Sequence, residues 1–277
     1  MAAISVAPLS ALLQDLTLLV TGIGLLCGDM FLPHERAFLQ WLTVVGAITA
    51  LAAIVAVSAG GEVTVFDGMF CADGFGALLK AVCVMALAFK ALMSESFFSH
   101  AQMRQGGYYC LAVCSTLGMC VMASAGDLIV LYLGLELLAL PYYALAALRS
   151  SDSAIKYFLL GSFALALLLF GMSLLYGLTR HTELAWIAAA LPAAASGQMP
   201  ALVVALALML AGMGFKAAAA PFHVWVSDMY EGAPTNVPAF MSVAAKTASF
   251  AVLARVLVMA LPSLVSRGAA LWPLWPY

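Results

Sequence analysis

Eight long apolar runs dominate the sequence, and they constrain the fold more than any other feature. A helix that spans a membrane needs about 20 predominantly apolar residues, and each run is close to that length. The runs are Ala11–Leu32, Ala37–Ala59, Phe75–Met93, Gly106–Ala125, Asp127–Leu148, Ala154–Leu178, Met199–Ala220 and Asn236–Leu261. Hydrophobic residues make up 65% of the chain and charged residues 9%, against about 25% charged residues in soluble domains. The sequence therefore predicts an all-α integral membrane protein with about eight spanning helices.

The few charges exclude one function and predict a topology. The formal net charge is −2, so the chain has no basic surplus for binding nucleic acid. Lysine and arginine in short loops mark the cytoplasmic side of a membrane protein. The first, third and fifth loops carry Arg36, Arg104, and Arg149 with Lys156, whereas among the other loops only the sixth carries a basic residue, Arg180. We therefore expect the N-terminus to face away from the cytoplasm.

Two connections between the apolar runs have structure of their own. Residues Gly60–Gly74 include the β-favouring stretch Val63–Phe66, which predicts a small hairpin. The connection before the seventh run includes Leu184–Leu191, an apolar piece too short to span a bilayer. We expect it to be a surface helix that ends at Pro192.

The seventh run contains a break in its helix. Its sequence is GMGFKAAAAPFHVW from Gly212 to Trp225, and Pro221 removes a backbone donor and clashes with the preceding turn. We expect the helix to break at Pro221 and to resume as a short piece, Phe222–Tyr230. Broken helices recur where transporters hold ions, although a simple proline kink is the plainer alternative.

Four polar residues lie where a lipid bilayer disfavours them. A charge at the centre of a membrane helix costs about 2.5–3.5 kcal/mol on insertion scales. Glu136 is nine residues into its run and Lys246 is ten residues into the last run, while Lys216 precedes Pro221 in the broken run and His223 follows it. Buried lysines and histidines can carry protons, so we interpret these four as proton-transfer residues. The alternatives are a protonated glutamate in a structural hydrogen bond, fixed lysine ion pairs and a structural histidine.

The remaining charges within the runs have simpler interpretations. We expect Lys90 to extend its amine to the membrane surface, and Lys80 to pair locally or with lipid headgroups. Arg255 belongs either to the same polar axis or to an anchor for a neighbouring helix. Asp15 and Asp29 bracket the first run and are expected at the membrane interfaces.

The sequence contains no pattern for covalent or redox chemistry. It has no glycine fingerprint for a dinucleotide and no cysteine set for an iron–sulfur cluster. Five of the six cysteines lie inside apolar runs, which favours packing over metal binding. Acid and amine groups near mid-depth on three helices therefore indicate proton movement.

Four stretches carry a resemblance to a known family. They are LYLGLELLALPYYALAAL (131–148), AIKYFLLGSFALALLLFGMSLLYG (154–177), GFKAAAAPFHVWVSDMYEGAPTNVPAF (214–240) and SVAAKTASF (242–250). The chain resembles the antiporter-like membrane subunits of respiratory complex I, NADH-quinone oxidoreductase, and within them the subunit N type. The resemblance implies that Glu136, Lys216, Lys246 and His223 form a proton path. It also implies a multi-pass protein of the bacterial inner membrane with a periplasmic N-terminus.

The family's fold has fourteen helices built from two inverted five-helix repeats. By that resemblance, residues 1–105 form an N-terminal three-helix segment, residues 106–261 form the first repeat, and residues 262–277 form a truncated tail. The chain is expected to lack the second repeat, so its own proton path is expected to be incomplete.

The resemblance also implies the chain's chemistry and its partners. The chain itself is expected to bind no cofactor, whereas the complex uses NADH, FMN, iron–sulfur clusters and quinone. Its partners would be the other membrane subunits of complex I, the lipid bilayer and protons. The alternatives are a subunit of a related cation/proton antiporter or membrane hydrogenase, or an inactive assembly fragment.

Overall fold

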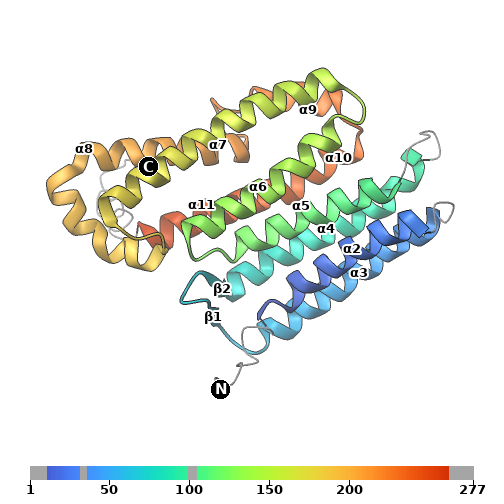
Figure 1. Ribbon diagram of the computed structural model, residues 1–277, viewed down its shortest axis with the longest axis horizontal. Helices are drawn as coiled ribbons and strands as arrows, with labels where there is room; N and C mark the ends of the chain where they lie inside the picture. The colour runs from blue at the N-terminus through green and yellow to red at the C-terminus, as the bar shows by residue number, and fades with distance from the viewer. Residues whose placement is uncertain (1–10, 32–35, 99–104, 262–277) are drawn as a thin grey trace, which may run out of the picture.

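The computed structural model describes residues 11–31, 36–98 and 105–261. Over these residues the chain is a bundle of long helices with one small hairpin (Figure 1). Within these described ranges, eight helices are long and apolar enough to cross a membrane, so the predicted number is confirmed. The predicted tail and Arg104 lie outside the described residues. The helices and strands are α2 (Leu13–Phe31), α3 (Arg36–Ser58), β1 (Val63–Val65), β2 (Phe70–Ala72), α4 (Gly74–Phe98), α5 (Gln105–Ala123), α6 (Leu128–Ala146), α7 (Ser151–Thr179), α8 (Leu184–Ala217), α9 (Trp225–Gly232), α10 (Asn236–Phe240) and α11 (Lys246–Arg255).

The last membrane span is one long helix with two wider turns in it. It runs over Asn236–Ala260, and its α-helical parts α10 and α11 are followed by π-helical segments at Met241–Ala245 and Val256–Ala260. A π-helical turn contains one more residue than an α-helical turn and often lies at a functional site. Lys246 directly follows the first of these segments.

Helix α5 occupies the centre of the bundle. Its candidate membrane span is 72% buried, against 33% for the span at the end of α8. Small residues allow this position, because they let neighbouring helix backbones approach closely. At Gly118, an added Cβ atom would lie 2.5 Å from the Leu138 nitrogen and 2.8 Å from the Gly134 oxygen of α6.

We expect Gly118→Val to destabilise the bundle by about 1–3 kcal/mol, the typical cost of forcing extra atoms into a packed core. The backbone of α6 cannot rotate away as a side chain could. The control is Gly107→Ala in the same helix, where an added Cβ meets nothing within 4 Å. Thermal unfolding in detergent should show a lower Tm for Gly118→Val alone, and equal Tm values for the two variants would contradict the close packing.

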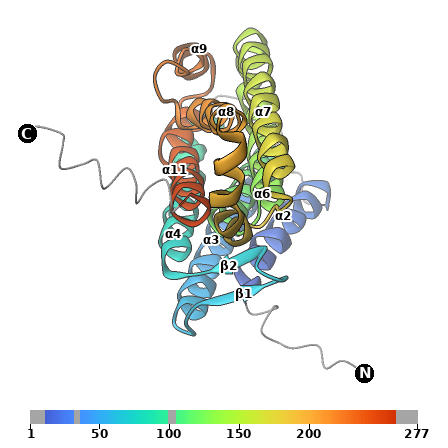
Figure 2. The ribbon, with the colours of Figure 1, turned by 90° about the vertical axis from the view of Figure 1, so that its left-hand side faces the viewer.

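The hairpin closes one end of the bundle, which we call the hairpin end. Strands β1 and β2 are antiparallel and pair Val63 with Ala72, as the β-favouring residues predicted. The Cys71 nitrogen donates to the Ser124 oxygen at 2.8 Å, and the Gly126 nitrogen donates to the Met69 oxygen at 2.9 Å. These bonds tie the hairpin to the connection between α5 and α6. Figure 2 views the molecule from this end, with the hairpin facing the viewer.

Helix α8 corrects one prediction about its first half. The helix does not end at Pro192 but continues to a kink at Gln198 (φ −136°, ψ 40°), just before Pro200. One proline removes a single backbone hydrogen bond, which bends a helix without having to end it. The short apolar piece is therefore the first arm of a bent helix rather than a separate element.

Candidate functional site

Glu136 lies in the middle of α6 and is half-buried. Its Oε1 atom accepts a hydrogen bond of 2.9 Å from the hydroxyl of Tyr132, one turn earlier on the same helix. Among the described residues it forms no ion pair within 4.0 Å. Its nearest polar partner is therefore a neutral phenol of its own helix.

Lys216 lies in the last turn of α8, where the helix ends at Ala217. The lysine is only 7% exposed. Its Nζ atom lies 5.6 Å from the ring centroid of Tyr143 and has no hydrogen-bond partner among the described residues. Tyr143 belongs to α6, as Glu136 does, so the amine at the end of α8 packs against the helix that carries the acid.

The break after Lys216 begins earlier than predicted. Ala218 adopts the left-handed conformation (φ 58°) and caps α8, so the helix ends at Ala217, four residues before Pro221. The chain resumes as α9 at Trp225 rather than at Phe222. The break itself is confirmed, and Pro221 lies within it.

The carbonyl oxygens at the end of α8 do not hold the Lys216 amine, which has no hydrogen-bond partner among the described residues. The Phe215 oxygen accepts from the Trp225 side chain at 3.0 Å and from the Ala218 nitrogen at 3.1 Å. The indole of Trp225 therefore satisfies one of the carbonyl oxygens at the end of α8.

Lys246 meets Lys216 at a small internal cavity. The Lys246 Nζ atom lies 5.7 Å from the ring centroid of Tyr230. The cavity has a volume of about 10 Å³, which is about the room that one water molecule requires. Its lining residues are Leu138, Tyr142, Tyr157, Lys216, Trp225, Tyr230, Met241, Ala245, Lys246 and Ser249.

Three polar atoms around this cavity have no hydrogen-bond partner among the described residues. They are the Lys216 Nζ atom and the hydroxyls of Tyr142 and Tyr230. Buried polar groups in proteins are nearly always paired, with protein or with water. The arrangement therefore fits a water molecule that connects two lysines through tyrosine hydroxyls.

The sequence alone did not point to the tyrosines that surround Lys216 and Lys246. One of them, Tyr143 beside Lys216, nevertheless has a local signal. Tyr143 lies seven residues after Glu136, and residues seven apart share a helix face. The contribution of Tyr230 from α9 had no such local signal, because it depends on how the chain turns after Pro221.

His223 is not brought to the cavity. It lies in the break between α8 and α9 and is exposed. Its role in proton transfer therefore remains a prediction from the sequence.

The position of Lys90 differs from the expectation that its amine extends to the membrane surface. It does not reach the membrane surface but is 3% exposed, with its Nζ atom 4.2 Å from the ring centroid of Tyr108 and 5.0 Å from that of Phe240. Helix α4 continues to Phe98, so about 12 Å of helix separates Lys90 from its end. The amine faces the bundle and is held by aromatic faces.

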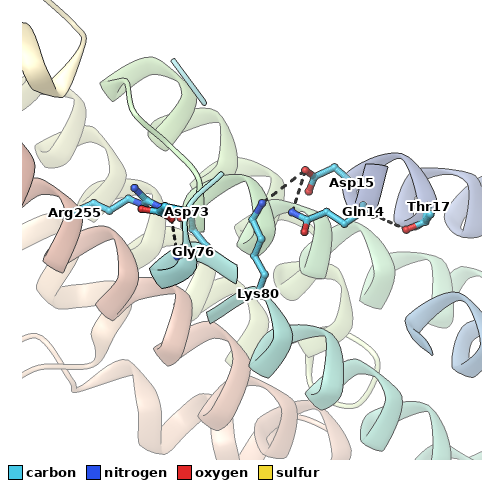
Figure 3. Close-up of polar contacts among 8 residues, drawn as sticks. Gln14, Asp15, Thr17, Asp73, Gly76, Lys80 and Arg255 are labelled. Atoms are coloured by element: carbon cyan, nitrogen blue, oxygen red, sulfur yellow. Dashed lines mark hydrogen bonds and ion pairs between the residues drawn. The ribbon is translucent and has the colours of Figure 1, made fainter. Parts of the chain in front are cut away.

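Four charged side chains form two ion pairs near the hairpin end (Figure 3). Arg255 pairs with Asp73 at 2.6 Å and donates from Nε to the Ala123 oxygen at 2.7 Å. The arginine thus anchors the end of α11 to the start of α4 and to the end of α5. Lys80 lies 4.0 Å from the Asp15 carboxylate, and both residues are buried, so Asp15 is not exposed at an interface.

No metal site is evident in the part of the chain that the structure describes, since it holds no group of three or more His, Cys, Asp or Glu side chains that could bind one. The site therefore consists of one acid, two amines and tyrosine hydroxyls, all of which can exchange protons.

Comparison with known proteins places the chain in a family. The profile of the family described as NADH:quinone oxidoreductase/Mrp antiporter, transmembrane, matches residues 125–271. The NADH-quinone oxidoreductase subunit N of Desulfovibrio desulfuricans is 59% identical, over 97% of this chain and 54% of its own length. The chain thus spans about half the length of that curated relative.

Two solved structures share the fold. A chain of respiratory complex I from Thermus thermophilus with bound aureothin is 32% identical, with a TM-score of 0.76 over 91% of this chain and 54% of that one. A chain of the Mrp complex from a Dietzia species is 25% identical, with a TM-score of 0.76 over 92% and 49% of the two chains.

Proposed function

Since the chain belongs to the NADH:quinone oxidoreductase/Mrp antiporter family of membrane proteins, we propose that it is a proton-translocating membrane subunit of a NADH-quinone oxidoreductase. The subunit N resemblance read from the sequence motifs is confirmed by the 59% identical relative. The chain would bind no redox cofactor and would couple electron transfer by other subunits to proton movement through Glu136, Lys216 and Lys246.

The observation that carries this proposal is the shared cavity of Lys216 and Lys246. Two lysines from different helices line the same space, with two tyrosine hydroxyls that have no hydrogen-bond partner among the described residues. A proton on one amine can pass to the other through a hydrogen-bonded water, because each group both binds and releases a proton. The carboxylate of Glu136 attracts the proton on Lys216 and thereby affects when it moves.

The electrostatic energies are large enough for such coupling. Two unit charges about 6 Å apart at an effective dielectric constant near 20 interact by about 3 kcal/mol. Moving a unit charge against 100 mV of membrane potential costs about 2.3 kcal/mol. Making or breaking one acid–amine interaction could therefore drive one proton against the potential.

The rest of the proposal concerns location and partners. The chain would lie in the bacterial inner membrane with its N-terminus and hairpin end on the periplasmic side, and would pack against other membrane subunits of the complex. Residues 106–261 would act as one five-helix repeat behind a three-helix segment, and His223 would relay protons at the break.

The test is the variant Glu136→Gln, measured in inverted membrane vesicles that contain the assembled complex. Glutamine keeps the shape and can accept from Tyr132, but it has no charge to act on Lys216. We expect NADH oxidation to continue while proton uptake, followed by quenching of a pH-sensitive dye, is lost. Unchanged proton uptake per NADH would refute the proposed coupling.

A second candidate is a subunit of a cation/proton antiporter, which the likeness to the Mrp complex chain favours. A sodium or potassium gradient imposed on vesicles without NADH distinguishes the two. Proton flux driven by that gradient supports the antiporter, and flux driven only by NADH supports the oxidoreductase. Normal pumping with every charge of the site neutralised would instead indicate a role in assembly.

A further inference from the structure

A polar pocket at the hairpin end is not used by the proposed function. Its volume is about 260 Å³, which is room for several water molecules. It lies between the start of α2, the end of α3, the hairpin and the start of α4. The polar residues of its lining are Gln14, Ser58, Glu62, Asp73, Lys80 and Ser124.

Two buried oxygens, one in the pocket lining and one beside Lys80, need a partner that the described residues do not supply. The hydroxyl of Ser124 lines the pocket and has no hydrogen-bond partner, and the residue is fully buried. The Oδ1 atom of Asp15, whose side chain lies beside Lys80, also has none. Because buried oxygens are normally hydrogen-bonded, the Ser124 hydroxyl indicates that water enters this pocket, and the Asp15 oxygen beside Lys80 needs a polar partner as well.

Lys80 is held loosely beside the pocket (Figure 3). Its Nζ atom lies 4.0 Å from the Asp15 Oδ2 atom, which is too long for a hydrogen bond, and 4.8 Å from the ring centroid of Phe70. The other titratable or charged groups that act on it are Asp73, Arg255 and Cys120.

The neighbouring ion pair is held much more tightly. Arg255 and Asp73 bind each other at 2.6 Å, and Asp73 also accepts from the Gly76 nitrogen at 2.8 Å. The amine of Lys80 can therefore gain or lose its proton without breaking a close bond, whereas the Arg255 pair cannot.

Lys80 also lies at an intermediate depth between the hairpin end and Lys246. Helices α4 and α11 run in opposite directions, since the Arg255–Asp73 pair joins the end of α11 to the start of α4. At 1.5 Å per residue, Lys80 is about 9 Å beyond Gly74, and Lys246 is about 14 Å from Arg255. The Cys83 thiol, one turn after Lys80, donates to the Ala244 oxygen at 3.6 Å, so the two lysines belong to adjoining turns of packed helices.

We propose that Lys80, with Asp15 beside it, is a further proton-exchange site that links the mid-membrane lysines to water at the hairpin end. The Lys80 ammonium gives its proton to a water molecule in the pocket, which leaves a neutral amine and a hydronium ion. A proton arriving from the membrane interior restores the ammonium, and the Asp15 carboxylate keeps its charge throughout. This inference rests on the proposed function. It adds the site at which protons would exchange with water on one side of the membrane.

The first test compares Lys80→Met, Lys80→Arg and the double variant Asp15→Asn/Lys80→Met in vesicles that contain the assembled complex. Arginine keeps the ion pair but does not release its proton, and the double variant removes both charges together. All three variants should pump at least about tenfold fewer protons per NADH, since a positioned proton-transfer group contributes at least that much. A purely structural ion pair predicts instead that Lys80→Arg or the double variant pumps normally, and either result overturns the proposal.

The second test measures whether water reaches the pocket. Ser124→Cys, in a Cys71→Ser background, should react with a membrane-impermeant thiol reagent added on the side of the hairpin end. The control is Ser115→Cys, two to three turns deeper in α5, which is fully buried and should not react. Absence of labelling at position 124 overturns the proposal.

The two proposals fail in different ways. If Lys216→Met pumps normally, the proposed function is wrong. If Lys216→Met stops pumping while Lys80→Met pumps normally, only the exchange site at Lys80 is wrong.

Discussion

Replacing Lys216 by methionine is expected to reduce NADH-driven proton pumping about a hundredfold or more, which is the usual contribution of a positioned proton-transfer group. Methionine fills nearly the same volume in the buried site but cannot bind a proton. It also removes one of the two amines at the cavity shared with Lys246. The measurement is proton uptake per NADH oxidised in inverted vesicles.

Two controls separate proton transfer from structure at this position. Lys216→Arg keeps a cation beside Tyr143, but arginine stays protonated at any physiological pH, so it too should fail to pump. Lys156→Met removes a lysine that pairs with Asp152 on the surface, where both side chains are more than half exposed, and should pump normally. Pumping by Lys216→Arg at the native rate would show that only the charge of Lys216 matters.

Replacing Arg255 by methionine is expected to destabilise the folded bundle by about 3 kcal/mol. Removing one partner of a buried ion pair costs about 3–5 kcal/mol, and the lower value applies because the Asp73 side chain is 25% exposed. The variant also leaves the Ala123 oxygen without its donor. The measurement is the thermal midpoint of unfolding in detergent, together with the yield of folded protein.

The double variant Arg255→Met/Asp73→Asn tests the cause of that loss. Without the arginine, the uncompensated carboxylate of Asp73 is the main source of instability, so neutralising it should restore part of the Tm. A double variant that is less stable than Arg255→Met would show that Asp73 acts mainly through the Gly76 nitrogen, to which it also binds.

The sequence was sufficient for features that depend on local chemistry. The lengths of the apolar runs predicted all eight spans, Val63–Phe66 predicted the hairpin, and Pro221 predicted the break. Glu136, Lys216 and Lys246 could be placed within spans by counting residues, because the rise per residue of a helix is constant.

Features that depend on packing between distant helices could not be predicted. Lys90 was expected at the surface, but which way a helix turns its lysine depends on its neighbours, and here Tyr108 and Phe240 receive it. The same holds for Lys80 and Asp15, whose helices α4 and α2 are separated in the chain order by α3 and the hairpin. Tyr230 reaches the cavity from α9, so its position depends on how the chain continues after the break.

The π-helical segment before Lys246 changes which side of the last span each following residue faces. One extra residue in a turn rotates everything after it by about 100° relative to an ideal helix. A helical wheel drawn from Asn236 at a constant 3.6 residues per turn therefore places Lys246 and Ser249 on the wrong side of the helix. The inward direction of Lys246 is encoded by an irregularity of the backbone, so an insertion or deletion of one residue in Met241–Ala245 would turn the amine away from its cavity while leaving its depth in the bilayer almost unchanged.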